Sequence, residues 1–433
     1  MIKEISGREL ALAVLLEMEQ GEKSHIALRR VLEKYQYLDK RERAFATRLA
    51  EGTTERRIEL DYVIDQFSKV KIRKMKPVIR CILRCAVYQM KYMESVPDSA
   101  ACNEAVKLAV KKGFGNLRGF VNGVLRSIAR NPDIRYPGNE NFAEYLSVRW
   151  SVPEWIISMW LMDYGKERTK ELLASLYIEK ATTIRVNEER ISREALKEKL
   201  RQEGATVKEH PLHSAALLIS DYDYLGILPG FREGYFQVQD VSSIQAAERA
   251  GIREGDHVID VCAAPGGKAL HAAQLLKGSG YVEARDLTEE KVNLIWENIR
   301  RMGCSNIRAK RWDALVYDVD SEGKADVLLA DLPCSGLGVM SKKTDIKYRV
   351  TNEQIKELVA LQRRILETVH SYVRPGGTLV YSTCTVCRAE NEENARWFTQ
   401  KFPEYAMKYE EQIVPSETTD GFYIAVFKRM GEE

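Results

Sequence analysis

The feature that most constrains the fold is a regular alternation of strand-like and helix-like stretches over residues 258–428. Short apolar runs rich in β-branched residues, such as 258–262 and 325–330, are separated by amphipathic stretches such as 289–302 and 353–371. This alternation is typical of an open, doubly wound sheet whose parallel strands are joined by helices on both faces. It predicts an α/β domain that binds its ligand at the carboxyl ends of the strands.

The first strand of this region ends in a glycine-rich turn. The residues of the turn and the helix start are Cys262, Ala263, Ala264, Pro265, Gly266, Gly267 and Lys268. A strand, a tight turn and a helix in this order bring backbone N–H groups close to the polar atoms of a ligand. The turn matches neither the dinucleotide fingerprint nor the phosphate loop. By itself it indicates a nucleotide-like ligand or a plain tight turn.

Acidic residues follow the next two strands. Asp286 lies 20 residues beyond Gly266, where a carboxylate commonly takes the ribose hydroxyls of a nucleotide. Asp313 follows the third strand, where a carboxylate can face an adenine amine. Either residue can also merely cap a helix. Together with the turn, they outline a site along successive strand ends.

Two cysteines and an aspartate end the later strands. Asp331 and Cys334 follow the fourth strand, and Cys384 follows a later one, so we expect the two thiols to face one crevice beside the carboxylate. Cys384 and Cys387 also have metal or redox spacing. No second C-x-x-C and no nearby histidine pair completes a zinc site, so no metal is predicted.

The first part of the chain predicts an all-α bundle over residues 5–130. Ser6 is expected to cap the first helix, and Pro77 fits the first turn of a later helix. Cys81 and Cys85 fall at i, i+4 on an apolar face, where we expect buried thiols rather than ligands.

The charge of the chain is unevenly distributed. Residues 1–130 contain 26 Lys and Arg and 16 Asp and Glu, a net charge of +10. The net charge of the whole chain is +3, so residues 131–433 carry 3 − 10 = −7. A basic bundle joined to a mildly acidic domain predicts that the bundle helps to hold a polyanion. The alternative is an ordinary solvated Lys/Arg surface.

Three domains are expected: a bundle over 1–133, linker helices with a small α/β subdomain over 134–229, and the doubly wound domain over 230–433. Residues 230–240 are predicted to form a hairpin. No signal peptide or membrane-spanning run is apparent, and the eight cysteines are too sparse for a disulfide framework. We therefore expect a cytoplasmic, reduced protein that does not act at a membrane.

The bundle resembles the NusB-type helical RNA-binding domain. The resemblance rests on Arg8-Glu-Leu-Ala-Leu, Lys40-Arg-Glu-Arg-Ala-Phe, residues 100–109 and Phe120-Val-Asn-Gly-Val-Leu-Arg126. It implies an RNA or protein partner for the basic bundle, and no chemistry.

Residues 256–428 resemble the Rossmann-type, S-adenosylmethionine-dependent RNA cytosine-C5 methyltransferases of the Fmu/NSUN class. The matching motifs are Cys262–Lys268, Asp331-Leu-Pro-Cys-Ser-Gly-Leu-Gly338, Ser382-Thr-Cys384 with Glu390-Asn391, and Asp420-Gly-Phe-Tyr423. Arg185-Val-Asn187 and Gln239–Ser243 match upstream segments of the family. Fusion to a NusB-like domain is similar to bacterial enzymes that act on 16S rRNA.

This resemblance implies roles for individual residues. The backbone of 262–268 would hold the methionine part of S-adenosylmethionine, with Asp286 at the ribose and Asp313 at the adenine. Cys384 would be the nucleophile that adds to carbon 6 of cytosine, Asp331 would hydrogen-bond N3, and Cys334 would assist product release.

Basic residues near the site are candidates for RNA contact. Because the target base must leave its stack, we expect single-stranded or distorted RNA. The candidates for holding its phosphates are Lys342, Lys343, Lys347, Arg349 and Arg185. An ordinary solvated charge is the alternative for each.

The resulting hypothesis is a monomeric 16S rRNA cytosine-C5 methyltransferase. The nearest alternative is the same chemistry on tRNA. Adenine-N6 methylation fits poorly, because an Asn/Asp-Pro-Pro-aromatic signature is absent. From a different class, a non-catalytic NusB-like RNA-binding factor would leave Asp331, Cys334 and Cys384 unexplained.

Overall fold

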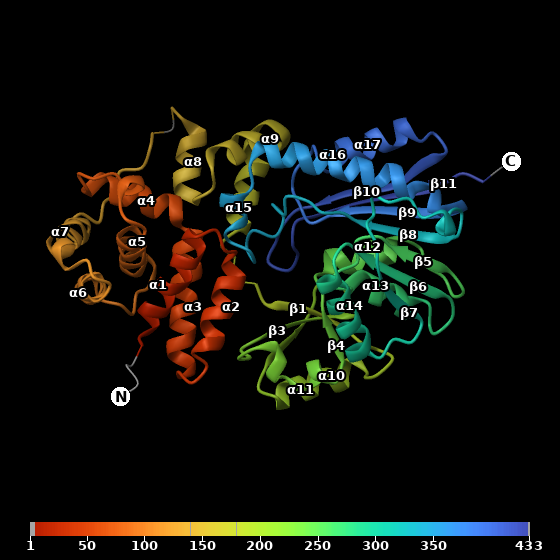
Figure 1. Cartoon of the computed structure of the whole chain (residues 1–433), viewed down its shortest axis with the longest axis horizontal. Helices are drawn as coiled ribbons and strands as arrows, with labels where there is room; N and C mark the ends of the chain where they lie inside the picture. Colours follow the sequence, from red (N-terminus) through yellow and green to blue (C-terminus); the bar gives the residue numbers. More distant parts are fainter. Residues whose placement is uncertain (1–4, 139, 179, 432–433) are drawn as a thin grey trace. The chain divides into compact units, whose positions relative to one another are not determined.

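A computed structural model describes residues 5–138, 140–178 and 180–431. The chain forms two compact units, one of residues 1–173 with 342–349 and the other of residues 174–341 with 350–433 (Figure 1). The predicted domain boundaries near residues 133 and 229 remain predictions, because the two compact units divide the chain at other positions.

The first unit is helical. Its elements are α1 (Gly7–Glu19), α2 (Ser24–Lys34), α3 (Lys40–Glu55), α4 (Arg57–Phe67), α5 (Pro77–Tyr92), α6 (Asp98–Lys111), α7 (Arg118–Ala129), α8 (Phe142–Trp150), most of α9 (Glu154–Ser175), the short helix α15 (Ile346–Arg349) and the 3-10 turns at Ile72–Lys74 and Gly115–Leu117. Ser6 caps α1 in a capping box with Glu9, and Pro77 is at the start of α5, as the sequence predicted.

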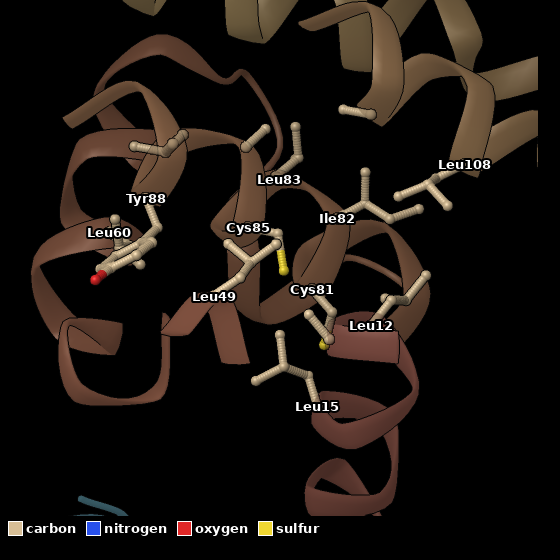
Figure 2. Close-up of a cluster of buried hydrophobic side chains, with 14 of the residues drawn as sticks. Leu12, Leu15, Leu49, Leu60, Cys81, Ile82, Leu83, Cys85, Tyr88 and Leu108 are labelled. Carbon is tan, nitrogen blue, oxygen red and sulfur yellow. The ribbon is translucent and has the colours of Figure 1, made fainter. Parts of the chain in front are cut away.

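The core of the bundle is built around α5. Leu12, Leu49 and Ile82 are buried there, with the thiols of Cys81 and Cys85 between them (Figure 2). Burial raises the pKa of both thiols to about 12, because a low-dielectric environment disfavours the thiolate. Both are inert, buried thiols, as predicted.

The second unit contains two sheets. A small antiparallel sheet has the order β2-β3-β1-β4, and a large sheet has the order β10-β11-β9-β8-β5-β6-β7. The small sheet comprises β1 (Thr182–Val186), β2 (Thr206–Glu209), β3 (Ala216–Ser220) and β4 (Phe236–Val238), with α10 (Arg193–Gln202), α11 (Pro229–Arg232) and the 3-10 turn Leu225–Ile227 beside it.

The large sheet is parallel from β7 to β9, and β11 pairs antiparallel with both of its neighbours, β9 and β10. Its strands are β5 (His257–Asp260), β6 (Tyr281–Asp286), β7 (Ile307–Arg311), β8 (Ala325–Asp331), β9 (Val373–Thr383), β10 (Tyr405–Ile413) and β11 (Phe422–Arg429). The helices are α12 (Val241–Arg249), α13 (Gly267–Leu275), α14 (Glu289–Met302), α16 (Asn352–Val369) and α17 (Glu392–Lys401); 3-10 turns lie at Val319–Ser321 and His370–Tyr372.

Helices cover both faces of the large sheet (Figure 1). Val258 packs in a core with residues of α12, α13 and α14, whereas its neighbour Ile259 packs with residues of α16 and α17. Because successive strand side chains point to opposite faces, these two cores lie on opposite sides of the sheet. The predicted doubly wound α/β fold is confirmed.

Two details differ from the sequence prediction. The hairpin predicted at 230–240 is wrong: α11 is followed by one strand, β4, which pairs with β1. Edge strands β2 and β10 were not predicted, because their alternation is interrupted by exposed polar side chains. Among the described residues, no helix is long and apolar enough to cross a membrane.

Candidate active site

The predicted site residues lie at one edge of the large sheet. Strands β5, β6, β8 and β9 are parallel neighbours, so their carboxyl ends meet at that edge. The residues at or just after these ends are Asp260 with loop 262–268, Asp286, Asp331 and Cys384. Asp313 follows the next strand, β7.

The turn after β5 is folded by backbone hydrogen bonds and by Asp286. The N–H of Ala263 donates to the carbonyl of Arg285 (2.8 Å), and the N–H of Ala264 donates to Asp286 Oδ2 (3.0 Å). Gly266 has a φ of 109°, in the left-handed region that favours glycine. Helix α13 then begins at Gly267 without a side-chain cap, which leaves its first N–H groups for a ligand.

The two acids predicted to face a nucleoside differ in their surroundings. Asp286 is buried, and its Oδ1 accepts hydrogen bonds from the Leu287 N–H (2.8 Å) and from Lys291 Nζ (2.9 Å). Asp313 is half-buried and accepts from the N–H of Leu315 (2.9 Å). Asp286 therefore shapes loop 262–268 directly, whereas Asp313 closes a local turn.

Asp260 is a buried acid at the end of β5 that the sequence argument did not single out. Burial, together with the nearby charge of Asp331, raises the pKa of Asp260 to about 7. Its Oδ1 accepts from the N–H of Cys262 (3.3 Å). The signal in the sequence was a polar residue inside an apolar strand that leads into the turn.

Asp331 is held by two partners. Lys268 Nζ, from the first turn of α13, lies 2.7 Å from its Oδ2, and the hydroxyl of Ser382 donates to its Oδ1 (2.9 Å). The Lys268 ammonium also lies 5.0 Å from the centre of the Phe422 ring. Loop 262–268 and the carboxylate at the end of β8 are thus joined by an ion pair.

The structure brings the two predicted cysteines together. Cys334 Sγ and Cys384 Sγ are 3.4 Å apart, although the residues are 50 apart in the sequence. The hydrogen bond to Cys384 and burial raise the pKa of the Cys334 thiol well above its ordinary range. The neighbouring Cys387 is buried, and no group of metal-binding side chains occurs among the described residues.

The loops that carry the cysteines are held by close backbone contacts. The N–H of Gly338 donates to the carbonyl of Cys384 (3.1 Å), and the N–H of Gly421 donates to the carbonyl of Gly338 (2.9 Å). A Cβ at Gly338 would lie 2.0 Å from the Gly421 oxygen. Only glycine fits at this crossing, which explains Gly338 in the first motif and Gly421 in the second.

A buried polar cluster supports the same loops. Glu390 accepts hydrogen bonds from the Ser335 N–H (2.9 Å), from the Ser335 hydroxyl and from Gln362 Nε2 (3.1 Å). The hydroxyls of Ser335 and Thr385 are 2.6 Å apart. Burial raises the pKa of Glu390. The sequence motif contained Glu390, but only the fold shows that it joins the Cys334 loop to the Cys384 loop.

The candidates for RNA contact are not equally accessible. Lys342, Lys343 and Arg349 are exposed, whereas Lys347 and Arg185 are buried. Burial within the protein keeps Lys347 and Arg185 away from a phosphate backbone, so the prediction of direct RNA contact is corrected for these two.

Arg185 instead joins the small sheet to Gln239 and to helix α13, which follows loop 262–268. Its Nε donates to Gln239 Oε1 (2.8 Å), and its Nη1 donates to Gln274 on α13. Gln239 in turn packs against Gly267, where an added Cβ would meet it at 3.6 Å. Arg185 is therefore placed to support the start of α13.

Comparisons with known proteins cover nearly the whole chain. The NusB family model matches residues 6–130, a ferredoxin-like domain model of RsmF/B-like methyltransferases matches 152–222, and the model for the 16S rRNA methyltransferase RsmB/F matches 250–428. The chain is 35% identical to the probable ribosomal RNA small subunit methyltransferase B of Bacillus subtilis, over 99% of this chain and 100% of that protein.

Solved structures share the fold. PH0851 matches with a TM-score of 0.82 at 24% identity, over 98% of this chain and 99% of that one. NSun6 from Pyrococcus horikoshii, solved with SFG, matches with a TM-score of 0.57 at 24% identity, over 65% of this chain and 99% of that one.

Proposed function

Because the chain belongs to the RsmB/F family of 16S rRNA methyltransferases, we propose that it methylates carbon 5 of a cytosine in 16S ribosomal RNA through a covalent adduct of Cys384. The observation that carries the proposal is the pair of thiols, Cys334 and Cys384, 3.4 Å apart. Asp331 ends β8, the parallel neighbour of β9, so its carboxylate lies at the same edge of the sheet.

The cofactor of this family is S-adenosylmethionine, and the strand ends fit it. It supplies a methyl group on a cationic sulfonium. The uncapped start of α13 suits its carboxylate, since a helix N-terminus attracts anions. Asp286 and Asp313 are proposed to hold the ribose and the adenine end, and the buried acid Asp260 favours a positively charged ligand nearby.

Cys384 is proposed as the nucleophile. Carbon 5 of cytosine is too weakly nucleophilic to take a methyl group unaided. Addition of the Cys384 thiolate to carbon 6 makes the ring enamine-like, so that carbon 5 can attack the methyl group. The thiol of Cys334, whose sulfur is 3.4 Å from that of Cys384, lies where a hydrogen bond to the Cys384 sulfur can stabilise negative charge there.

Asp331 is proposed to hydrogen-bond the cytosine at N3, where negative charge develops during the addition. The Lys268 ammonium, 2.7 Å from Asp331, keeps a proton and a positive charge beside that position. Ser382 fixes the other carboxylate oxygen, so the group is oriented before the base arrives.

Product release requires that the proton on carbon 5 leave and that the bond between Cys384 and carbon 6 break. A base accepts the carbon-5 proton while the Cys384 sulfur departs with the bonding electrons as a thiolate, and Cys334 is proposed to assist this step from its place beside Cys384. The relative in Bacillus subtilis, which carries the name of a small-subunit rRNA methyltransferase, and the NusB-family match favour ribosomal RNA over tRNA as the substrate of a monomeric enzyme.

Cysteine variants test the mechanism. Cys334→Ala should accumulate a covalent protein–RNA complex, visible as a slowly migrating band in denaturing gels. Cys384→Ala should abolish both the complex and methyl transfer. Cys304→Ala is the control, because this half-buried thiol lies outside the site, and it should behave like the wild type.

Full methyl transfer by Cys384→Ala would refute the covalent mechanism. Nucleoside mass spectrometry of 16S rRNA and tRNA incubated with the wild type tests the product and the substrate. A product other than 5-methylcytosine, or methylation of tRNA alone, would refute those parts of the proposal. RNA binding without any methyl transfer would favour the non-catalytic alternative.

A further inference from the structure

The residues beside each site thiol are held by two buried polar side chains of the second unit. Glu390 and Asn391 are consecutive residues just before α17, and both are 0% exposed. Their side chains reach different strand ends: Glu390 contacts the loop of Cys334, and Asn391 contacts the end of β9 that leads to Cys384. Because buried polar groups are nearly always hydrogen-bonded, these contacts are strongly specified.

Glu390 holds the residue that follows Cys334. Its Oε1 accepts a hydrogen bond from the Ser335 N–H (2.9 Å), and its Oε2 accepts from the Ser335 hydroxyl. On the other side of the thiol, Gln362 Nε2 donates to the carbonyl of Pro333 (2.8 Å) and to Glu390 Oε1 (3.1 Å). The backbone is thus held directly before and directly after Cys334.

Asn391 holds the residues on both sides of Cys384. Its Oδ1 accepts from the Thr383 hydroxyl (2.6 Å), and its Nδ2 donates to the carbonyl of Thr385 (3.0 Å). The same Nδ2 also donates to Gln412 Oε1 of β10 (2.6 Å), which orients the amide. Two consecutive residues therefore hold the surroundings of the two thiols.

Ser335 and Thr385 join the two sets of contacts. Their hydroxyl oxygens are 2.6 Å apart, and each belongs to the residue directly after a site thiol. The two sulfur atoms are themselves 3.4 Å apart. A shift of about 1 Å in either loop would change this separation substantially, and a misplacement of that size can lower a rate on the order of 10²-fold.

We propose that Glu390 and Asn391 together set the separation of the site thiols, Glu390 by positioning Cys334 and Asn391 by positioning Cys384. This inference rests on the proposed function, which gives the two thiols different steps. Loss of the Glu390 contacts should slow the elimination in which the Cys384 sulfur leaves carbon 6 as a thiolate. Loss of the Asn391 contacts should slow the addition to carbon 6. Both are positioning residues, because they are buried and act through the residues beside the thiols.

Two substitutions of Glu390 in the full-length protein test the first half of the proposal. Glu390→Ala should accumulate the covalent protein–RNA complex to about tenfold the wild-type level in denaturing gels, because Cys334 is no longer correctly placed for elimination. Glu390→Gln keeps an oxygen that accepts from the Ser335 N–H, so it should behave like the wild type. Ser335→Ala removes the hydroxyl and keeps the N–H, and it should show a smaller accumulation.

The second half is tested by Asn391→Ala and by Thr383→Val, which removes a hydroxyl and keeps the shape of the side chain. Each should lower the single-turnover rate of methyl transfer by about tenfold at saturating RNA and S-adenosylmethionine, without accumulation of the complex. In the Cys334→Ala background, Asn391→Ala should slow formation of the complex. Glu390→Ala should add no further effect there, because the thiol that it positions is already absent.

The matched control is Asp326→Ala. Asp326 lies near the start of β8, at the opposite end of the strand from the site, where its Oδ2 accepts from the His257 N–H (2.8 Å) and its Oδ1 accepts from Arg374. Its loss removes polar contacts of the same unit without touching either cysteine loop. The rate of methyl transfer and the level of complex should match the wild type.

Equal slowing of complex formation by Glu390→Ala and Asn391→Ala in the Cys334→Ala background would overturn the proposal, since general destabilisation acts on both alike. Wild-type rates and complex levels in both single variants would also overturn it. Phenylarsine oxide, which bridges neighbouring thiols, gives a readout without RNA. Its bridging of Cys334 to Cys384, mapped by mass spectrometry, should weaken in both variants, and unchanged bridging would refute the positioning role. Weakened bridging with no complex in Cys334→Ala would instead refute the proposed function.

Discussion

Replacing Gly338 by alanine tests whether the crossing of the two cysteine loops sets the reaction geometry. The new Cβ would lie 2.0 Å from the Gly421 oxygen and 2.9 Å from the Cys384 oxygen, whereas real contacts are essentially never under 3.0 Å. One backbone must therefore shift by about 1 Å. A misplacement of about 1 Å can lower a rate on the order of 10²-fold, which equals about 2.7 kcal/mol of barrier.

The assay is single-turnover methyl transfer to 16S rRNA at saturating RNA and S-adenosylmethionine, with calorimetric unfolding in parallel. Overpacking at Gly338 should also cost about 1–3 kcal/mol of stability, so the rate is measured well below the unfolding transition. Gly123→Ala in α7 is the control, since a Cβ there meets nothing within 4 Å. A folded Gly338→Ala enzyme with the wild-type rate would refute the reasoning.

Three further predictions concern charge. The pKa of Asp260 is raised from 3.8 to about 7, so protonation of this group stabilises the folded state at low pH, and that stabilisation is lost as the pH rises through 7. Between pH 6 and 8, the free energy of unfolding of the wild type should fall by about 1.4 kcal/mol relative to that of Asp260→Asn, measured by denaturant unfolding. Equal pH dependence of the two proteins would contradict the raised pKa. Arg185→Met removes the hydrogen bonds to Gln239 and Gln274 and should raise the KM for S-adenosylmethionine about tenfold, with little change in RNA affinity. Steady-state kinetics measure the KM, and filter binding measures the RNA affinity. Weaker RNA binding with an unchanged KM would instead support direct contact of Arg185 with RNA. Glutamine should replace four exposed cations of the bundle together: Lys69, Arg73, Lys74 and Lys76. The slope of log RNA-binding constant against log salt concentration should then become shallower by about 0.7–0.9 for each RNA phosphate that these side chains neutralise in the wild type. An unchanged slope would mean that their charges are ordinary solvated surface charges.

The order of strands and helices could be predicted from the sequence, because hydrophobic periodicity and the turn residues that end a strand are visible within short stretches of sequence. The predicted helix 289–302 and strand 307–311 match α14 and β7 at both ends. The proximity of Cys334 and Cys384 also followed from the sequence, since parallel strands place their carboxyl ends together whatever the loops between them do.

The parts that could not be predicted depend on contacts distant in the sequence. Lys347 appeared to be one more surface charge beside Lys342 and Lys343, yet it packs 292 residues away against Glu55. The ion pair of Lys268 with Asp331 spans 63 residues. Neither pairing leaves a periodic pattern, so only the fold shows them.

The return of the chain to the helical unit at residues 342–349 has a consequence during synthesis. The bundle emerges first from the ribosome, but the residues that complete its packing at Ser24 and Glu55 follow Leu173 by roughly 170 positions. At about 5–20 residues per second, this gap corresponds to roughly 10–35 s of translation. During that interval the start of α2 and the end of α3 lack their partners, and the first unit reaches its final packing only after most of the second has been made.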